Sequence, residues 1–282
     1  MIPEIEHLIN NKGIPSGFPS LDKITGSWQN GDLIVVGSRP GVGKSTFGLN
    51  VAINVAINMN VPVMYFSQEM TNKQIAKRLL YSRANADGYY TNQITNLDGP
   101  EWQKIEDCLL KLTKAPAYFN DTPFLGISGF CEKVQKYVSE LGVKLIIIDY
   151  LQFLQLMRRW PENWCRCVDD INHIIRLLKE TAAATGISVI VLTALHRLRR
   201  KHSNAYLKPT LEDFWEMNAV EECADMVILL DRNSKERIEN YQEVEAEAEF
   251  IVAVNKHGRT GSASMLFDKD TLSFVDPLTH KD

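Results

Sequence analysis

The sequence has few cysteines, no long apolar run and no excess of positive charge, and each of these shortages excludes a class of protein. Its five cysteines are an odd number without the paired spacing of a zinc site, which favours free thiols in a reducing compartment. No apolar run approaches the length of a membrane span, and the first residues lack the basic and apolar regions of a secretion signal. A net charge of −4 offers no global attraction for nucleic acid, so such binding would need local basic clusters. We therefore expect a globular cytoplasmic protein without a membrane partner.

What the sequence does contain is a regular alternation of apolar runs with helical patterns. The predicted strands are residues 33–36, 61–66, 117–119, 145–148, 188–192, 226–230 and 249–254. The predicted helices are residues 44–60, 72–86, 101–112 and 128–141, and a further helix that ends at Gly186. This alternation is typical of an α/β fold, with a mostly parallel sheet covered by helices on both faces. Residues 1–12 are a predicted tail or linker, residues 13–31 a looped entry rich in Gly, Pro and Ser, and 13–282 a single domain.

The segment that organises the chain is residues 32–50, DLIVVGSRPGVGKSTFGLN. An apolar strand, a glycine-rich turn, a Lys-Ser pair and a helix follow one another, which is the context of a phosphate-binding loop. Backbone N–H groups at Gly41 and Gly43 can turn toward an anion, Lys44 can reach the β- and γ-phosphates, and the Ser45 hydroxyl can ligate Mg²⁺. The strict pattern has Gly where this chain has Ser38. The residues predicted to bind nucleotide are Ser38, Arg39, Pro40, Gly41, Val42, Gly43, Lys44, Ser45 and Thr46.

Two carboxylates follow predicted strands and are expected to converge on this loop. Asp149 ends a wholly apolar strand, where it could hold Mg²⁺ beside Ser45 or merely cap the next turn. Glu69 follows the strand 61–66, where it could activate the attacking water or sit at a helix N-terminus that favours negative charge. Ligands gather at the carboxyl ends of parallel strands, so Lys44, Glu69 and Asp149 should meet there.

Five segments together resemble the C-terminal motor domain of DnaB-type replicative helicases. They are SGFPSLDKITGSWQNGDLIVVGSRPGVGKSTF, VMYFSQEM, KLIIIDYLQFL, AVEECAD and GRTG, in the order that the family has. The resemblance implies a RecA-like ATPase fold, a ring of six subunits with ATP and Mg²⁺ between neighbours, and 5′-to-3′ movement on single-stranded DNA. It also implies that Glu69 is the catalytic glutamate, that Arg39 matches a family position, and that a loader or primase is a possible partner. By the resemblance, we expect this sequence to lack the family's separate N-terminal helical domain and to begin near the linker that would follow it.

The resemblance also exposes several departures from the family pattern. Ala194 replaces a Gln that senses the γ-phosphate, and alanine has no side-chain hydrogen-bonding group. Trp215 replaces a usual Arg, and Asn218 replaces a Gly. Val254 replaces a Lys, and Lys256 replaces the Arg that reaches into the neighbouring subunit's site; Lys lacks the planar fork of Arg. We expect Lys256 to act in trans with weaker stabilisation than Arg would give, or Arg259, three residues on, to take that role.

Two basic segments are candidates for contact with a DNA backbone. MRRWPEN offers Arg158 and Arg159 beside an aromatic residue, and HRLRRKH offers Arg197, Arg199, Arg200 and Lys201. By the resemblance, these two loops face the channel of the ring and follow the phosphates of a single strand. The alternative is two solvated basic loops on an acidic protein.

Two further functions stay open at this level. The departures at Ala194, Trp215 and Val254 are compatible with a degenerate, non-unwinding ring subunit or loader that uses nucleotide binding to control assembly. A recombination or repair ATPase of the same fold would form filaments instead of closed rings, and no feature of the sequence separates the two.

Overall fold

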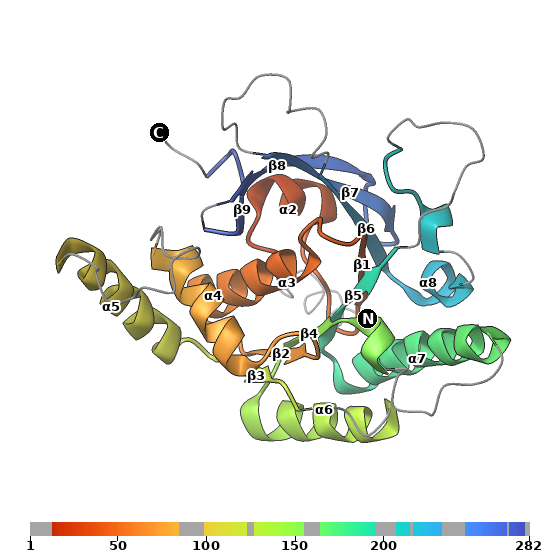
Figure 1. Ribbon diagram of the computed structural model, residues 1–282. Helices are drawn as coiled ribbons and strands as arrows, with labels where there is room; N and C mark the ends of the chain where they lie inside the picture. Colours follow the sequence, from red (N-terminus) through yellow and green to blue (C-terminus); the bar gives the residue numbers. More distant parts are fainter. Residues whose placement is uncertain are drawn as a thin grey trace, which may run out of the picture.

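The computed structural model describes residues 13–84, 99–122, 127–154, 164–195, 207–214, 217–232, 246–269 and 271–279. A single sheet runs through these segments, in the strand order β3-β2-β4-β5-β1-β6-β7-β8-β9 (Figure 1). The six strands from β3 to β6 pair in parallel, and β7, β8 and β9 continue the sheet antiparallel. The predicted α/β fold with a mostly parallel sheet is confirmed.

The strands are β1 (Leu33–Ser38), β2 (Val63–Ser67), β3 (Ala117–Asn120), β4 (Leu145–Asp149), β5 (Ser188–Ala194), β6 (Met226–Asp231), β7 (Ala246–Asn255), β8 (Gly261–Asp268) and β9 (Ser273–Val275). The α-helices are α2 (Pro19–Thr25), α3 (Lys44–Ile53), α4 (Asn72–Ala84), α5 (Gly99–Lys114), α6 (Ile127–Leu141), α7 (Trp164–Thr185) and α8 (Asn218–Cys223). Shorter turns are the π-helix η1 (Asn54–Asn58) and the 3₁₀ turns η3 (Leu151–Leu154) and η4 (Leu211–Phe214). No helix in these segments combines the length and apolar character that a membrane crossing requires.

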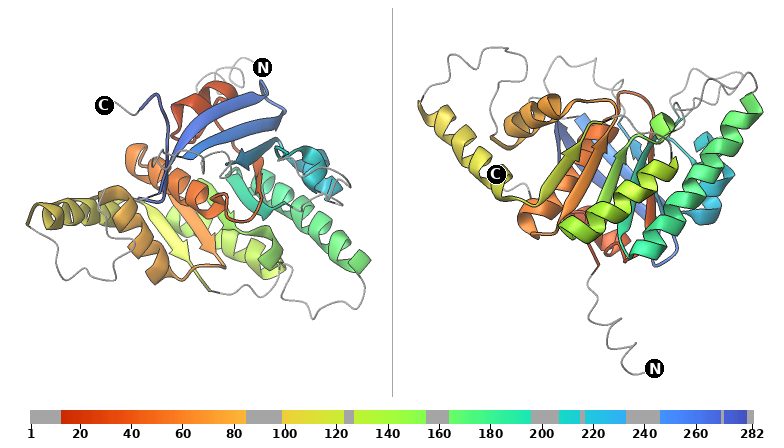
Figure 2. Two further views of the ribbon diagram at one scale, coloured as in Figure 1. Left: turned by 45° about the horizontal axis from the view of Figure 1, so that its top comes forward. Right: turned by 90° about the horizontal axis from the view of Figure 1, so that it is seen from below.

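The central strands are mostly apolar because both of their faces are covered. Successive side chains on a strand point to opposite faces, so Ile34 and Val36 of β1 join one core while Leu33 and Val35 join the other. Helices α2, α3 and α4 pack on the first face, and α6, α7 and α8 pack on the second (Figures 1 and 2). Strand β1 lies between β5 and β6. The chain leaves β1 toward β2 on one side of the sheet, whereas it leaves β5 toward β6 on the other side. Such a switch point opens a crevice at the carboxyl ends of the strands.

Three sequence expectations need correction. The segment 13–31 is not entirely looped, because Pro19 begins helix α2 and Asp22 in its first turn accepts hydrogen bonds from Ser16 and Gly17. The helix from Lys44 keeps α-helical pairing only to Ile53 and continues as a π-turn. Strands β8 and β9 were not predicted, and they extend the sheet so that it curves over α2 and α3 (Figure 1).

Candidate functional site

The predicted phosphate-binding loop connects the carboxyl end of β1 to the first turn of α3. Gly41 and Gly43 have φ angles of +79° and +121°, a region that residues with a side chain rarely enter. At Gly43 a Cβ atom would also lie 2.9 Å from the Phe274 ring, so the loop has no room for a side chain there. Lys44, Ser45 and Thr46 form the first helical turn, whose backbone N–H groups have no partner within the helix. The loop therefore presents donors and a helix N-terminus on one side, as an anion site requires.

Lys44 lies near the carboxyl end of β4, which β5 separates from β1 in the sheet. Its ammonium lies 5.7 Å from the centre of the Tyr150 ring. Burial lowers the pKa of Lys44, and the negative charges of Asp149 and Glu69 oppose that shift. The same carboxylates therefore favour the charged ammonium that binding a phosphate needs.

Asp149 occupies the carboxyl end of β4, in register with Ser67 of β2 and Leu192 of β5. Burial raises the pKa of its carboxyl, whereas the hydrogen bond from Tyr65, the nearby Ser45 hydroxyl and the charge of Lys44 lower it. One oxygen, Oδ2, accepts the Tyr65 hydroxyl at 2.7 Å. The other, Oδ1, is buried without a hydrogen-bond partner. A buried carboxylate oxygen with no partner, beside the Ser45 hydroxyl, is a donor set that fits Mg²⁺.

Glu69 lies just beyond the carboxyl end of β2 and is exposed. The preceding residue is fixed, because Gln68 N donates to the Asp149 carbonyl at 2.9 Å. The Glu69 charge acts on Lys44, Asp149 and Tyr150, so the carboxylate shares their space. The structure thus brings Lys44, Ser45, Asp149 and Glu69 to one edge of the sheet, and the roles of these residues stay predictions.

The floor of the loop carries two of the sequence departures. Ser38 ends β1 and pairs in register with Ala194 at the end of β5. The amide of Gln152, in η3, fills the space beside Ala194, with Nε2 2.8 Å from Thr193 Oγ1 and 3.3 Å from the Ala194 carbonyl oxygen. A side-chain amide therefore lies next to the position where the family carries a glutamine. Arg39 faces Asp213 of η4, with NH2 3.7 Å from Oδ2.

Two arginines at the loop were not predicted from the sequence. Arg232 follows β6, donates to the Gly41 carbonyl at 2.7 Å and lies 4.0 Å from the centre of the Phe267 ring. Arg78 of α4 donates to the Thr46 hydroxyl at 2.5 Å. Arg232 contacts a residue 191 positions away, so no local pattern signalled its role.

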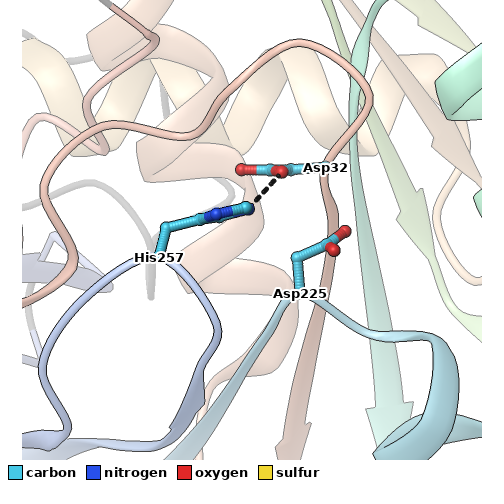
Figure 3. Close-up of side chains that lie close together, drawn as sticks. All are labelled: Asp32, Asp225 and His257. Atoms are coloured by element: carbon cyan, nitrogen blue, oxygen red, sulfur yellow. Dashed lines mark hydrogen bonds and ion pairs between the residues drawn. The ribbon is translucent and has the colours of Figure 1, made fainter.

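The turn that carries Lys256 is fastened at the opposite edge of the sheet. Lys256 N donates to the Asp225 carbonyl at 2.8 Å, and its ammonium donates to the Glu222 carbonyl of α8 at 3.0 Å. His257 Nε2 lies 2.9 Å from Asp32 Oδ1 (Figure 3). The exposed Arg259 has no ion pair with the described residues, although its carbonyl accepts from Asn255. Asp32 precedes β1 whereas the phosphate loop follows it, so about 17 Å of strand separates the turn from its own loop, at roughly 3.3 Å per residue.

Asp32, Asp225 and His257 also offer ligand atoms within 4.8 Å of one another, a spacing that a metal ion could bridge. A cation of the protein already serves this cluster. Lys179 Nζ lies 2.6 Å from Asp225 Oδ2 and 2.8 Å from the Gly31 carbonyl oxygen. We therefore interpret the cluster as a fastening for the turn and not as a metal centre.

The basic segments lie outside the described residues. This applies to Arg158, Arg159, Arg197, Arg199, Arg200 and Lys201, and also to Trp215. Their contact with DNA stays a prediction.

Comparison with known proteins places these features in context. The family model described as "DnaB-like helicase C terminal domain" matches residues 13–276. The "Replicative DNA helicase DnaB" of Geobacillus stearothermophilus is 34% identical over 270 residues, which cover 94% of this chain and 56% of that relative. The chain thus spans about half the length of this curated relative. Among solved structures, "ATPase Domain of G40P" matches with a TM-score of 0.81 and 26% identity, covering 98% of this chain and 95% of that one. "The Structure Of A DnaB-Like Replicative Helicase And Its Interactions With Primase" matches with a TM-score of 0.82 and 25% identity, over 97% and 64% of the two chains.

Proposed function

The chain belongs to the DnaB-like helicase C-terminal domain family, and we propose that it is the ATP-hydrolysing motor of a ring helicase that moves on single-stranded DNA. Movement from 5′ to 3′ and unwinding of duplex during replication are part of this proposal. Such a motor must be in the same compartment as the DNA, so the expected cytoplasmic location is also part of this proposal.

The proposed roles follow from where the side chains lie. The loop from Ser38 to Thr46 holds the phosphates, and Lys44 supplies the positive charge that answers the β- and γ-phosphates. Glu69 orients the attacking water and accepts its proton, because it is an exposed carboxylate just beyond the end of β2 whose charge acts on Lys44 and Asp149. Arg232 and Arg78 fix the loop and the first turn of α3 from outside.

Ser45 and Asp149 are the residues that would hold Mg²⁺. An ion bound there with ATP would neutralise negative charge on the phosphates. Asp149 Oδ1 supports this assignment, since a buried carboxylate oxygen without a partner is costly unless a ligand uses it.

The proposal includes a homo-hexamer in which Lys256 serves the site of the adjacent subunit. The position of its turn supports this arrangement, because the turn lies at the end of β1 away from the chain's own phosphate loop. Lys256 must leave the Glu222 carbonyl to reach a neighbour's γ-phosphate. The basic segments would contact single-stranded DNA. A primase is a candidate partner, because one structural relative is described together with its interactions with primase.

The observation that carries the proposal is the convergence of Lys44, Ser45 and Asp149 at the switch point of the sheet. The chain that forms this sheet belongs to the DnaB-like helicase family. It is tested by the ATP turnover rate with and without single-stranded DNA, on a sample whose mass in solution is measured in parallel. The proposal expects turnover that DNA stimulates in a hexamer. Nucleotide binding without turnover would instead identify a non-unwinding assembly or loader subunit, which the substitutions at Ala194 and Lys256 would then explain. DNA-stimulated turnover by an open filament would identify a recombination or repair ATPase.

A further inference from the structure

Tyr65 places a hydroxyl group deep inside an otherwise apolar core. The residue lies in the middle of β2, its side chain is fully buried, and it belongs to the core between the sheet and α3. Its register partner on β4 is Ile147, and Asp149 lies two residues further along the same face. Diagonal neighbours of this kind are within reach of a long aromatic side chain, so the phenol extends along the strand to the carboxylate.

The ring is held tightly in place. Gly48 of α3 leaves no room above it, since a Cβ atom there would lie 3.3 Å from a Tyr65 ring carbon, and the Phe119 ring centre is 5.9 Å away. Phenylalanine would fill the same space equally well. A buried hydroxyl costs free energy unless it is hydrogen-bonded, and this one donates to Asp149 Oδ2 at 2.7 Å.

The bond determines how the Asp149 carboxylate is turned. With Oδ2 held by a rigid donor, rotation about the bond that carries the carboxylate is restricted, and Oδ1 is the oxygen left free of hydrogen bonds. Hydrogen bonds of this kind to a ligating carboxylate orient it and tune its affinity for the metal. Packing alone would explain the ring but not the hydroxyl.

We propose that Tyr65 is a positioning residue for Mg²⁺ at this nucleotide site, holding Asp149 so that Oδ1 serves the ion or a water bound to it. The inference rests on the proposed function and deepens it, because it assigns the metal requirement of the site to a residue outside the phosphate loop. Tyr65 touches neither nucleotide nor ion and acts only through Asp149.

The test is the Mg²⁺ dependence of nucleotide binding in Tyr65→Phe. Binding of a fluorescent ATP analogue is titrated with Mg²⁺ at fixed nucleotide, and then measured again in EDTA. We expect the half-saturating Mg²⁺ concentration to rise by about tenfold or more, the range that loss of such a hydrogen bond costs. In EDTA, Tyr65→Phe should bind the analogue as well as the unaltered protein does, whereas a general structural defect would weaken binding there too.

The matched control is Tyr137→Phe. This variant also removes a hydrogen-bonded phenol hydroxyl. Tyr137 lies on α6, on the other face of the sheet, and its hydroxyl oxygen accepts a hydrogen bond from Asn120 Nδ2 at 3.0 Å. Its Mg²⁺ dependence should match that of the unaltered protein. Unchanged Mg²⁺ dependence in Tyr65→Phe, or an equal change in both variants, would overturn the inference. If the unaltered protein binds no ATP analogue, or binds it equally well in EDTA, the assigned Mg²⁺–ATP site is at fault and the inference falls with it.

Discussion

His257 reaches from the turn after β7 to Asp32 at the start of β1, with Nε2 2.9 Å from Oδ1. The turn that presents Lys256 is therefore fastened to the strand that ends in the phosphate-binding loop. Asp32 is itself held in place, because Oδ2 accepts the Gln29 N–H at 2.7 Å. One strand thus connects the chain's own nucleotide site to the group that it would offer to a neighbour.

Loosening this fastening should impair turnover without impairing nucleotide binding. His257→Ala removes the side-chain bond to Asp32, so Lys256 is presented less accurately, and misplaced catalytic groups lose rate steeply. We expect ATP turnover of the assembled protein to fall by about tenfold, with unchanged ATP affinity. His173→Ala, which removes an exposed histidine of α7, is the control. Equal turnover in the two variants would show that the Asp32–His257 pair does not position the turn.

Asp149 should lower the stability of the fold in the absence of nucleotide. Burial raises its pKa above the ordinary 3.8, so the folded state binds the proton more tightly than the unfolded state does. The stability associated with the protonated form is therefore lost as pH rises from 3.8 through the folded pKa, and the full cost is present only above the folded pKa. Asp149→Asn avoids that cost, and at a pH above the folded pKa we expect a higher melting temperature, by about 2–4 °C for each kcal/mol. The gain should shrink as pH falls below the folded pKa, and a gain that does not change with pH would contradict this account.

How much of this site the sequence could predict depends on the range of the contacts. The apolar run Leu145–Ile148 of β4 indicates a strand because both faces are buried, and the phosphate loop is specified by adjacent residues, so both were predictable. Helix α2 was missed because its Gly, Pro and Ser neighbours signal a loop, while its Asp22–Ser16 contacts are visible only in the fold. Strand β8 was missed because its alternating pattern is weak: the buried face begins with the small Ala263, and the apolar Leu266 occupies the opposite face. The roles of Arg232 and Tyr65 depend on partners 191 and 84 positions away, and a single sequence carries no signal for such pairs.

The basic segment 196–202 gives a prediction that depends on salt. If Arg199, Arg200 and Lys201 contact phosphates, replacing all three with alanine should weaken binding to single strands of every sequence tested. The log–log dependence of affinity on salt should flatten by about two units, at roughly 0.7 per neutralised phosphate. ATP affinity without DNA is the control and should not change. An unaltered salt slope would make these residues part of a solvated loop.

Action of Lys256 across a subunit boundary is tested by mixing two inactive proteins. Lys256→Ala keeps its own phosphate loop, and Lys44→Ala keeps its own Lys256. In mixed assemblies some boundaries pair an intact Lys44 with an intact Lys256, so ATP turnover should return in part. Mixing that restores nothing in a confirmed assembly, together with loss of activity in Arg259→Ala alone, would assign the role to Arg259.

The central claim is that the carboxyl ends of β1, β2 and β4 form a site that hydrolyses ATP, with Glu69 as the base. The most direct test measures ATP affinity and ATP turnover of Glu69→Gln side by side, with Lys44→Ala as the variant that should lose binding itself. The account predicts nearly unchanged affinity in Glu69→Gln and a turnover rate lower by about 10²–10⁴-fold, which is what a general base contributes. Normal turnover in Glu69→Gln would contradict it.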